Sequence, residues 1–153
     1  MKIDFKRLFI NILIPVGLGF IVSLITNPSG SYKDMIQPSF APPGILFPIV
    51  WTILYILMGI SSYIIEKSND SNYKDALSIY YAQLVVNLTW SFIFFMFKSY
   101  LLAFIWIILL IVLVIKMIKS FYSISKLSSY LQIPYLLWII FAAILNFSIY
   151  LLN

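Results

Sequence analysis

The stretch that decides the fold is Ser31-Tyr-Lys-Asp-Met-Ile-Gln-Pro-Ser-Phe-Ala-Pro-Pro-Gly44, followed closely by Phe47-Pro-Ile-Val-Trp51-Thr-Ile-Leu-Tyr55. Each proline in it fixes φ, lacks an N–H and moves the preceding residue out of the helical region, so residues 31–44 cannot form one continuous helix. The stretch therefore predicts a structured loop. A helix can begin at Pro43 or Gly44, with Trp51 and Tyr55 one turn apart on one face.

Outside this loop the chain is mostly hydrocarbon. Hydrophobic residues make up 63% and charged residues 10% of the 153, whereas soluble proteins average roughly 45–50% and 25%. Apolar runs of about 18–23 residues are long enough to cross a bilayer as helices, and open sheets are excluded there. We predict an all-α membrane protein, a single domain (1–153) forming a bundle of five transmembrane helices, with spans at about 8–26, 44–65, 76–97, 100–118 and 130–152.

The chain has no Cys and no His. Disulfides, thiolate nucleophiles, Cys or His metal sites and histidine acid–base chemistry are therefore excluded, and we expect no metal and no intrinsic cofactor. A net charge of +5 raises the possibility of nucleic-acid binding. The cations are scattered at helix ends without interleaved aromatics, so we expect membrane lipid and no nucleic acid as a partner.

The cations also predict an orientation. Five spans place the two termini on opposite sides of the membrane, with eight cations on the N-terminal side and only Lys33 and Lys98 on the other. The positive-inside rule then places the N-terminus in the cytoplasm and the proline-rich loop and C-terminus outside. The first apolar run resembles a signal peptide, but it is too long and lacks a small-residue cleavage site, so we interpret it as a retained span.

Polar and aromatic residues recur at helical spacing on three of the spans. On the third they share one face, and unpaired amides are costly in hydrocarbon, so this face should look into the bundle or a cavity. A cavity that opens outward under the loop is one interpretation; hydrogen bonding between helices and anchoring at the membrane interface is the other. The three sets are Phe47, Trp51, Tyr55 and Gly59; Gln83, Asn87 and Ser91; and Trp138, Ala142 and Asn146.

No Asp, Glu, Lys or Arg lies well inside a span. This argues against an ion-coupled transporter and leaves no conventional general acid, base or nucleophile. In the first span, Gly19-x-x-x-Ser23 allows close helix approach, either within the bundle or in a dimer.

The sequence resembles the TspO/MBR family of tryptophan-rich sensory proteins and translocator proteins, in particular its bacterial members. The resemblance covers essentially the whole chain. It rests on the following matches: Tyr32 through Pro38-x-Phe40-x-Pro42-Pro43; Phe47-x-x-x-Trp51-Thr52-x-Leu54-Tyr55-x-x-Met58-Gly59; Gln83-Leu84-x-x-Asn87-x-x-Trp90-Ser91-x-x-Phe94-Phe95; and Pro134-Tyr135-x-x-Trp138-x-x-Phe141-Ala142-x-x-Leu145-Asn146.

The resemblance implies an integral protein of a bacterial cell membrane that forms a homodimer. It also implies that porphyrins, including protoporphyrin IX and haem precursors, and benzodiazepine- or isoquinoline-type molecules bind beneath the first loop as ligands. By similarity, Trp51 and Trp138 would flank the ligand. The implied ligand-binding residues are Tyr32, Pro42, Phe47, Trp51, Asn87, Ser91, Trp138 and Ala142.

Two positions depart from the family pattern. Family members often have Trp before the loop tyrosine and Lys before its proline, where this chain has Ser31 and Gln37. Lys33 could supply the missing charge. The sterol-recognition pattern of animal relatives is incomplete, because no cation follows Tyr150.

Three functions remain open from the sequence. The first is a receptor or translocator-type protein that binds porphyrins and related planar molecules. The second is an enzyme that degrades porphyrin in a light- and oxygen-dependent reaction, with Trp51 and Trp138 taking part and the porphyrin supplying the photochemistry. The third is a membrane scaffold without a dedicated ligand.

Overall fold

A computed structural model describes residues 2–153, so Met1, the first residue of the predicted domain, lies outside it. The described residues form helices and no strands. The elements are α1 (Phe5–Thr26), α2 (Pro28–Lys33), α3 (Leu46–Lys67), α4 (Tyr73–Ser91), the π-helical turn η1 (Phe92–Met96), α5 (Tyr100–Ile124), α6 (Lys126–Tyr130) and α7 (Ile133–Leu152).

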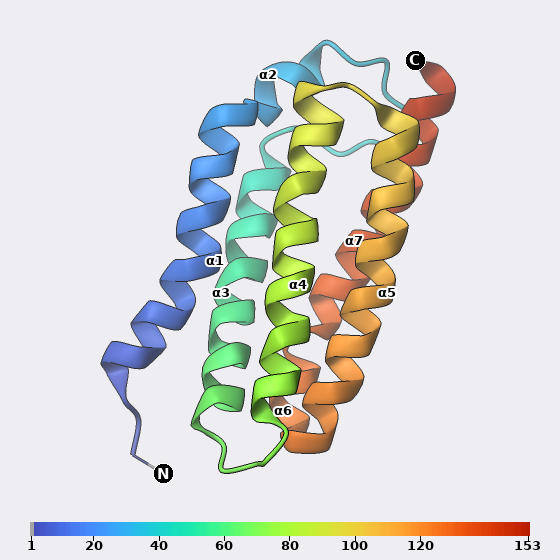
Figure 1. Ribbon diagram of the computed structural model, residues 1–153. Helices are drawn as coiled ribbons and strands as arrows, with labels where there is room; N and C mark the ends of the chain where they lie inside the picture. The colour runs from blue at the N-terminus through green and yellow to red at the C-terminus, as the bar shows by residue number, and fades with distance from the viewer. Residues whose placement is uncertain (1) are drawn as a thin grey trace.

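Five helical stretches are long and apolar enough to span a membrane. They are Phe5–Thr26, Leu46–Lys67, Tyr73–Met96, Tyr100–Ile124 and Lys126–Leu152. The predicted five-helix membrane bundle is thus confirmed. In Figure 1 the five long helices run side by side along the bundle, and the N- and C-termini lie at opposite ends. We call the end that holds the N-terminus the N-terminal end and the other the lid end.

Helix α1 packs on α3 and α4, while α5 packs on α4 and α7. Large aromatic side chains fill the space between α3 and α7. The rings of Phe47 and Trp138 lie 5.8 Å apart, and those of Trp51 and Tyr135 lie 6.2 Å apart. The proline-rich loop passes over the lid end of the bundle (Figure 1).

The loop is shorter than the sequence predicts, because its first residues are helical. Asn27 ends α1 with a left-handed conformation (φ 46°), and Pro28 opens α2, where its missing N–H costs nothing. Helix α2 therefore includes Tyr32. Residues 34–45, which we call the lid segment, then lead to α3, which begins at Leu46, two residues beyond Gly44.

Helix boundaries elsewhere follow local chemistry. The helix of α4 widens into η1 before the turn at Lys98, whose φ of 52° reverses the chain toward α5. Helix α5 runs to Ile124, beyond the predicted end near 118. Ser125 then adopts an extended conformation, and its hydroxyl accepts a hydrogen bond from the Ser128 N–H, which caps α6.

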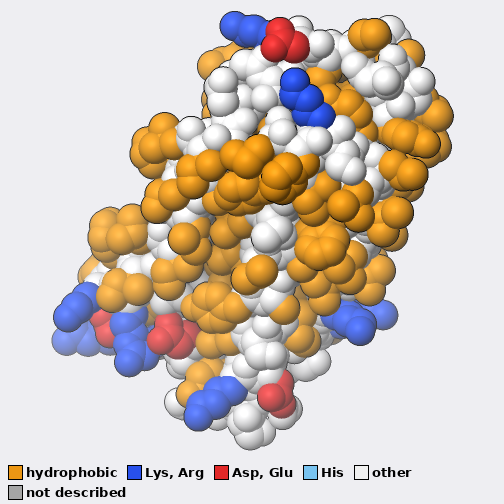
Figure 2. All heavy atoms as spheres, turned by 45° about the horizontal axis from the view of Figure 1, so that its top comes forward, with side chains coloured by type: hydrophobic (Ala, Val, Ile, Leu, Met, Phe, Trp, Pro, Cys, Tyr) orange, Lys and Arg blue, Asp and Glu red, His pale blue; other side chains and the backbone are white. Residues whose placement is uncertain are grey.

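Charged side chains gather at the two ends of the molecule, and the sides between them are hydrophobic (Figure 2). At the N-terminal end, Arg7 forms an ion pair with Glu66 at 3.1 Å. The second Glu66 oxygen accepts from Asn11 Nδ2 at 2.7 Å, and Asn11 Oδ1 accepts from Ser62 at 2.9 Å. This network joins the first half of α1 to the last turns of α3.

Candidate functional site

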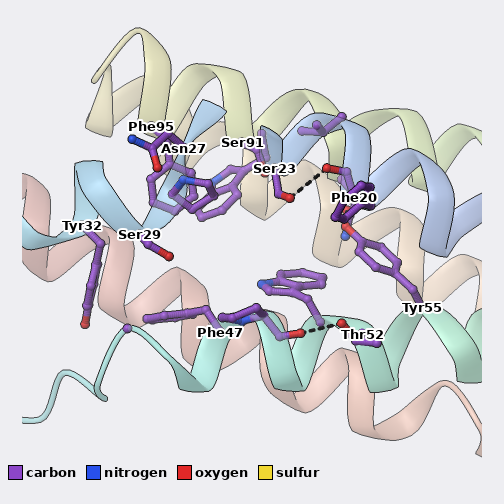
Figure 3. A pocket seen from close by; sticks show the side chains of 18 of the residues that line it. Phe20, Ser23, Asn27, Ser29, Tyr32, Phe47, Thr52, Tyr55, Ser91 and Phe95 are labelled. Atoms are coloured by element: carbon purple, nitrogen blue, oxygen red, sulfur yellow. Dashed lines mark hydrogen bonds between the residues drawn. The ribbon is translucent and has the colours of Figure 1, made fainter. Parts of the chain in front are cut away.

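A cavity of about 480 Å³ lies under α2, between the lid-end halves of α1, α3 and α4 (Figure 3). Its volume falls within the roughly 300–1,000 Å³ of typical small-molecule sites. Its lining residues are Val16, Gly19, Phe20, Val22, Ser23, Asn27, Pro28, Ser29, Tyr32, Gly44, Phe47, Pro48, Trp51, Thr52, Tyr55, Asn87, Trp90, Ser91 and Phe95.

The cavity is lined largely by aromatic rings from several elements. Trp51 stacks on Tyr55 with ring centroids 5.5 Å apart and an interplanar angle of 30°. Tyr32 meets Phe47 edge to face at 5.0 Å. Trp90 lies on α4 and stacks on Phe94 with ring centroids 4.9 Å apart. Such surfaces offer flat apolar area to a ligand, and edge-to-face or offset stacking adds to its binding.

The polar side chains of the cavity are all uncharged: serine, threonine, tyrosine and asparagine, together with the indole N–H groups of Trp51 and Trp90. Some are used by the protein itself, since Ser23 donates to the Phe20 carbonyl and Thr52 to the Pro48 carbonyl (Figure 3). Within the part of the chain that the structure describes, the hydroxyls of Ser29 and Ser91 form no hydrogen bond. These two hydroxyls can therefore donate to or accept from a bound molecule.

Asn87 lies at the deep end of the cavity and belongs to a buried network. Its Oδ1 accepts from the Tyr55 hydroxyl at 2.7 Å, and its Nδ2 donates to the Tyr135 hydroxyl at 2.8 Å. Tyr135 in turn donates to Gln83 Oε1 at 2.7 Å. The network joins α3, α4 and α7, so the amides predicted from the sequence hold helices together here, and Asn87 also lines the cavity.

The lid segment is held in place by its own residues. Tyr32 donates its hydroxyl to the Pro42 carbonyl at 2.8 Å, and Gln37 Nε2 donates to the Tyr32 carbonyl at 2.8 Å. Burial raises the pKa of the Tyr32 phenol, so Tyr32 stays a neutral donor at physiological pH. Gln37 thus serves to hold the lid segment in place.

The lid segment is also joined to the C-terminal helix. The Ile36 N–H donates to Asn153 Oδ1 at 3.1 Å, and Asn153 Nδ2 donates to the Ile36 carbonyl at 2.9 Å. Phe40 meets Phe141 of α7 edge to face at 6.4 Å. One asparagine side chain therefore pairs with both backbone groups of a single lid residue.

Replacing Asn153 with alanine is expected to loosen the lid segment without unfolding the bundle. The variant loses two hydrogen bonds, each with a net contribution of about 0.5–1.5 kcal/mol. The lid segment should therefore open roughly tenfold faster. Hydrogen–deuterium exchange of peptides covering residues 34–41 would measure it. Ser148→Ala, which removes a hydroxyl bonded only within α7, is the matched control. Unchanged exchange at Ile36 in Asn153→Ala would contradict the prediction.

A second, much smaller void of about 30 Å³ lies beside the cavity, toward α7. It shares Tyr32, Phe47, Trp51 and Trp90 with the cavity, so these rings form a partition between the two spaces. Trp138 and Ala142 lie on the far side of this partition. The Trp138 indole N–H is buried and has no hydrogen-bond partner among the described residues.

The structure thus brings together five of the eight predicted site residues on the main cavity: Tyr32, Phe47, Trp51, Asn87 and Ser91. Trp138 and Ala142 line only the smaller void, and Pro42 lines neither space but accepts the Tyr32 hydrogen bond. Trp51 and Trp138 therefore do not both face the cavity in this structure.

Sequence reasoning missed the contribution of α1, whose residues Gly19, Phe20, Ser23 and Asn27 line the cavity. The one sequence signal for this contribution of α1 was the spacing of Gly19 and Ser23. Gly19 lies against the Tyr55 ring, and a Cβ there would overlap that ring. The spacing allowed close helix approach either within the bundle or in a dimer. The contact that Gly19 makes is one within the bundle.

The cavity opens between α1 and α3. Several lining residues are also exposed on the protein surface. Among the long helices, only α1 and α3 contribute such residues: Phe20 and Ser23 of α1, and Pro48 and Thr52 of α3. At 1.5 Å per residue, Thr52 lies about 9 Å below the start of α3. The opening therefore faces sideways, at a depth where the helix surface is apolar.

Chemistry that needs charged or metal-bound groups finds little support in this cavity. Its lining, as described, has no Asp, Glu, Lys or Arg. Within residues 2–153 no three His, Cys, Asp or Glu side chains come together. The arrangement is suited to binding a flat, largely apolar molecule with a few polar edges.

Comparisons with known proteins agree with this architecture. The sequence profile of the TspO/MBR family matches residues 11–152. The chain is 40% identical to the tryptophan-rich protein TspO of Archaeoglobus fulgidus, over 96% of this chain and 97% of that protein. It is 30% identical to a tryptophan-rich sensory protein of Cereibacter sphaeroides (100% and 95%) and 31% identical to the translocator protein of Sus scrofa (90% and 85%).

Proposed function

The chain belongs to the TspO/MBR family, and from this premise we propose that it is a membrane receptor or translocator-type protein for planar aromatic molecules. The ligand class comprises porphyrins and benzodiazepine- or isoquinoline-type compounds. The observation that carries the proposal is the uncharged, aromatic-lined cavity of about 480 Å³ under α2 and beside the lid segment.

Each part of the cavity has a role in this proposal. Trp51, stacked on Tyr55, offers a large flat surface to a ring system. Ser29 and Ser91 supply free hydroxyls for polar edges of the ligand. Asn87 acts mainly by fixing Tyr55, since its amide already accepts from one tyrosine and donates to another.

We also propose that the N-terminal end faces the cytoplasm and the lid segment faces outside. The support is the distribution of cations: eight belong to the N-terminal end of the bundle, and Lys33 and Lys98 to the lid end. In this orientation the cavity opens toward the outer leaflet. Ligands would then be exchanged with that leaflet between α1 and α3.

Replacing Trp51 with leucine is expected to weaken ligand binding about tenfold, because a stacked aromatic pair contributes about 0.5–1.5 kcal/mol beyond its buried area. The measurement is a dark titration with protoporphyrin IX, followed by porphyrin absorbance, and a calorimetric titration with a neutral isoquinoline carboxamide, both in nanodiscs. Saturable binding by the unsubstituted protein is expected for each.

Trp106→Phe is the control, because Trp106 bonds to Val86 and Thr89 on the outer side of α4 and does not line the cavity. It should bind like the unsubstituted protein. Linear uptake that is equal in all three proteins would mean partitioning into lipid and would refute the proposed site. Trp90 is unsuitable as a control, since it lines the cavity.

A further inference from the structure

The cavity contains no group that can neutralise an anionic ligand. Its described lining carries hydroxyls, two phenols, two indole N–H groups and amides, and no cation. The two cations of the lid end, Lys33 and Lys98, have exposed side chains and do not line the cavity, and Lys33 is followed directly by Asp34. Gln37, directly before Pro38, is uncharged, and its amide donates to the Tyr32 carbonyl. No cation therefore lines the cavity.

Burial of a carboxylate in such a site is unfavourable. Transfer of an ion from water to an apolar environment is costly unless it is paired and hydrogen-bonded, and neutral hydroxyls do not pair it. An ester or amide carbonyl needs only one or two donors, which the hydroxyls of Ser29 and Ser91 can provide. The lining therefore favours the uncharged member of any pair of otherwise identical ligands.

The position of the opening also favours uncharged ligands over carboxylates. The exposed lining residues Phe20, Ser23 and Thr52 place it between α1 and α3, and Phe20 is 63% exposed. Thr52 lies about 9 Å below the start of α3. A carboxylate held at this side of the opening would face the apolar surface of the bundle, away from the exposed Asn27 and Ser29 at the lid end.

On the basis of the proposed function, we propose that this cavity selects uncharged planar aromatic ligands and discriminates against those that carry carboxylates. Among tetrapyrroles, esterified or carboxylate-free rings would be preferred over free diacids. Among smaller compounds, neutral carboxamides would be preferred over the corresponding acids. The selection follows from the residues of this chain's cavity and lid, and it narrows the ligand class that the family alone suggests.

The test compares protoporphyrin IX with its dimethyl ester, which has the same ring without the two charges. In nanodiscs of neutral lipid, we expect the ester to bind at least about tenfold more tightly. The ester also partitions more strongly into lipid. For this reason the decisive quantity is the ratio of the two affinities, compared between the unsubstituted protein and variants in identical nanodiscs, where partitioning cancels.

Ser29→Lys places a cation at the cavity rim, and Ser39→Lys adds the same charge to the lid segment at an exposed residue that does not line the cavity. Ser29→Lys is expected to lower the ester-to-acid affinity ratio about tenfold, and Ser39→Lys to leave it within about twofold. Equal affinities in the unsubstituted protein, or an identical shift in both variants, would overturn the charge selection alone. Saturable binding of neither porphyrin nor carboxamide would overturn the proposed function as well.

Discussion

Replacing Gly59 with alanine is expected to lower the thermal midpoint of the protein by about 5–10 °C, because overpacking of a tight contact costs roughly 1–3 kcal/mol and each kcal/mol shifts the midpoint by a few degrees. A Cβ at Gly59 would overlap Ile12 Cα and lie 2.7 Å from the Asn11 carbonyl oxygen. Both are backbone atoms of α1, so no side-chain rotation can relieve the contact.

The sequence of α1 explains why its backbone comes so close. Pro15 lacks the N–H that would bond to the Asn11 carbonyl, which leaves this oxygen free on the face toward Gly59. The same two helices are also joined by the hydrogen bond from Asn11 to Glu66 and, one turn nearer the N-terminus of α1, by the Arg7–Glu66 ion pair. An added methyl group must therefore push α1 away from α3 against these bonds.

The displacement should also reach the cavity, because the lid-end half of α1 lines it. Gly59→Ala is expected to weaken binding of an isoquinoline carboxamide in addition to lowering stability. Gly17→Ala is the matched control: its Cβ would meet only Leu13 Cδ1, at an ordinary 3.8 Å. Circular dichroism melts of both variants decide the matter, and equal midpoints would show that the Gly59 contact is not limiting.

The parts of the fold that follow from composition and proline chemistry could be predicted from the sequence. Long apolar runs require helices in a membrane, and the prolines at 38, 42 and 43 require a break between the first two spans. The spacing of Trp51 and Tyr55 correctly places them on one face, where their rings stack. These features depend on local rules, so one sequence suffices.

The contribution of α1 to the cavity depends on tertiary packing and could not be predicted in this way. Phe20 and Ser23 look like ordinary residues of an apolar helix, and only the close approach at Gly59 and Gly19 brings them beside α3. The same holds for Asn153, 117 residues from its partner Ile36. A terminal asparagine carries no sequence signal for a contact with a loop.

The position of Trp138 illustrates a different limit. The family resemblance implied that Trp138 and Trp51 flank one ligand, whereas the spacing of Trp138 on the fifth span concerns that helix alone. In the structure the two indoles share only the small void beside the cavity, where Phe47 meets Trp138 edge to face at 5.8 Å. Side-chain packing between helices decides which rings line the larger cavity, and such packing is not encoded in helix periodicity.

Replacing Asn87 with leucine is expected to lower the thermal midpoint by about 5–10 °C, since a buried donor left without an acceptor costs roughly 1–3 kcal/mol. Asn87 is 4% exposed, and its loss removes the acceptor of Tyr55 and the donor to Tyr135 at once. The Tyr55 hydroxyl then has no protein acceptor. Thermal melts followed by circular dichroism would measure the change.

A double variant separates this network from a simple packing effect. Asn87→Leu combined with Tyr55→Phe removes the orphaned hydroxyl, so it should recover part of the stability that Asn87→Leu loses, giving a favourable coupling of about 1 kcal/mol in the cycle. Ser91→Ala, one turn further along α4, removes a hydroxyl without a protein partner and should leave the midpoint unchanged.

If Asn87 acted on a ligand alone, Asn87→Leu would melt like Ser91→Ala in the absence of ligand. A loss confined to Asn87→Leu, with recovery in the double variant, means that the amide acts on the ligand through the tyrosine it holds, and that the cavity depends on the bonds between α3, α4 and α7.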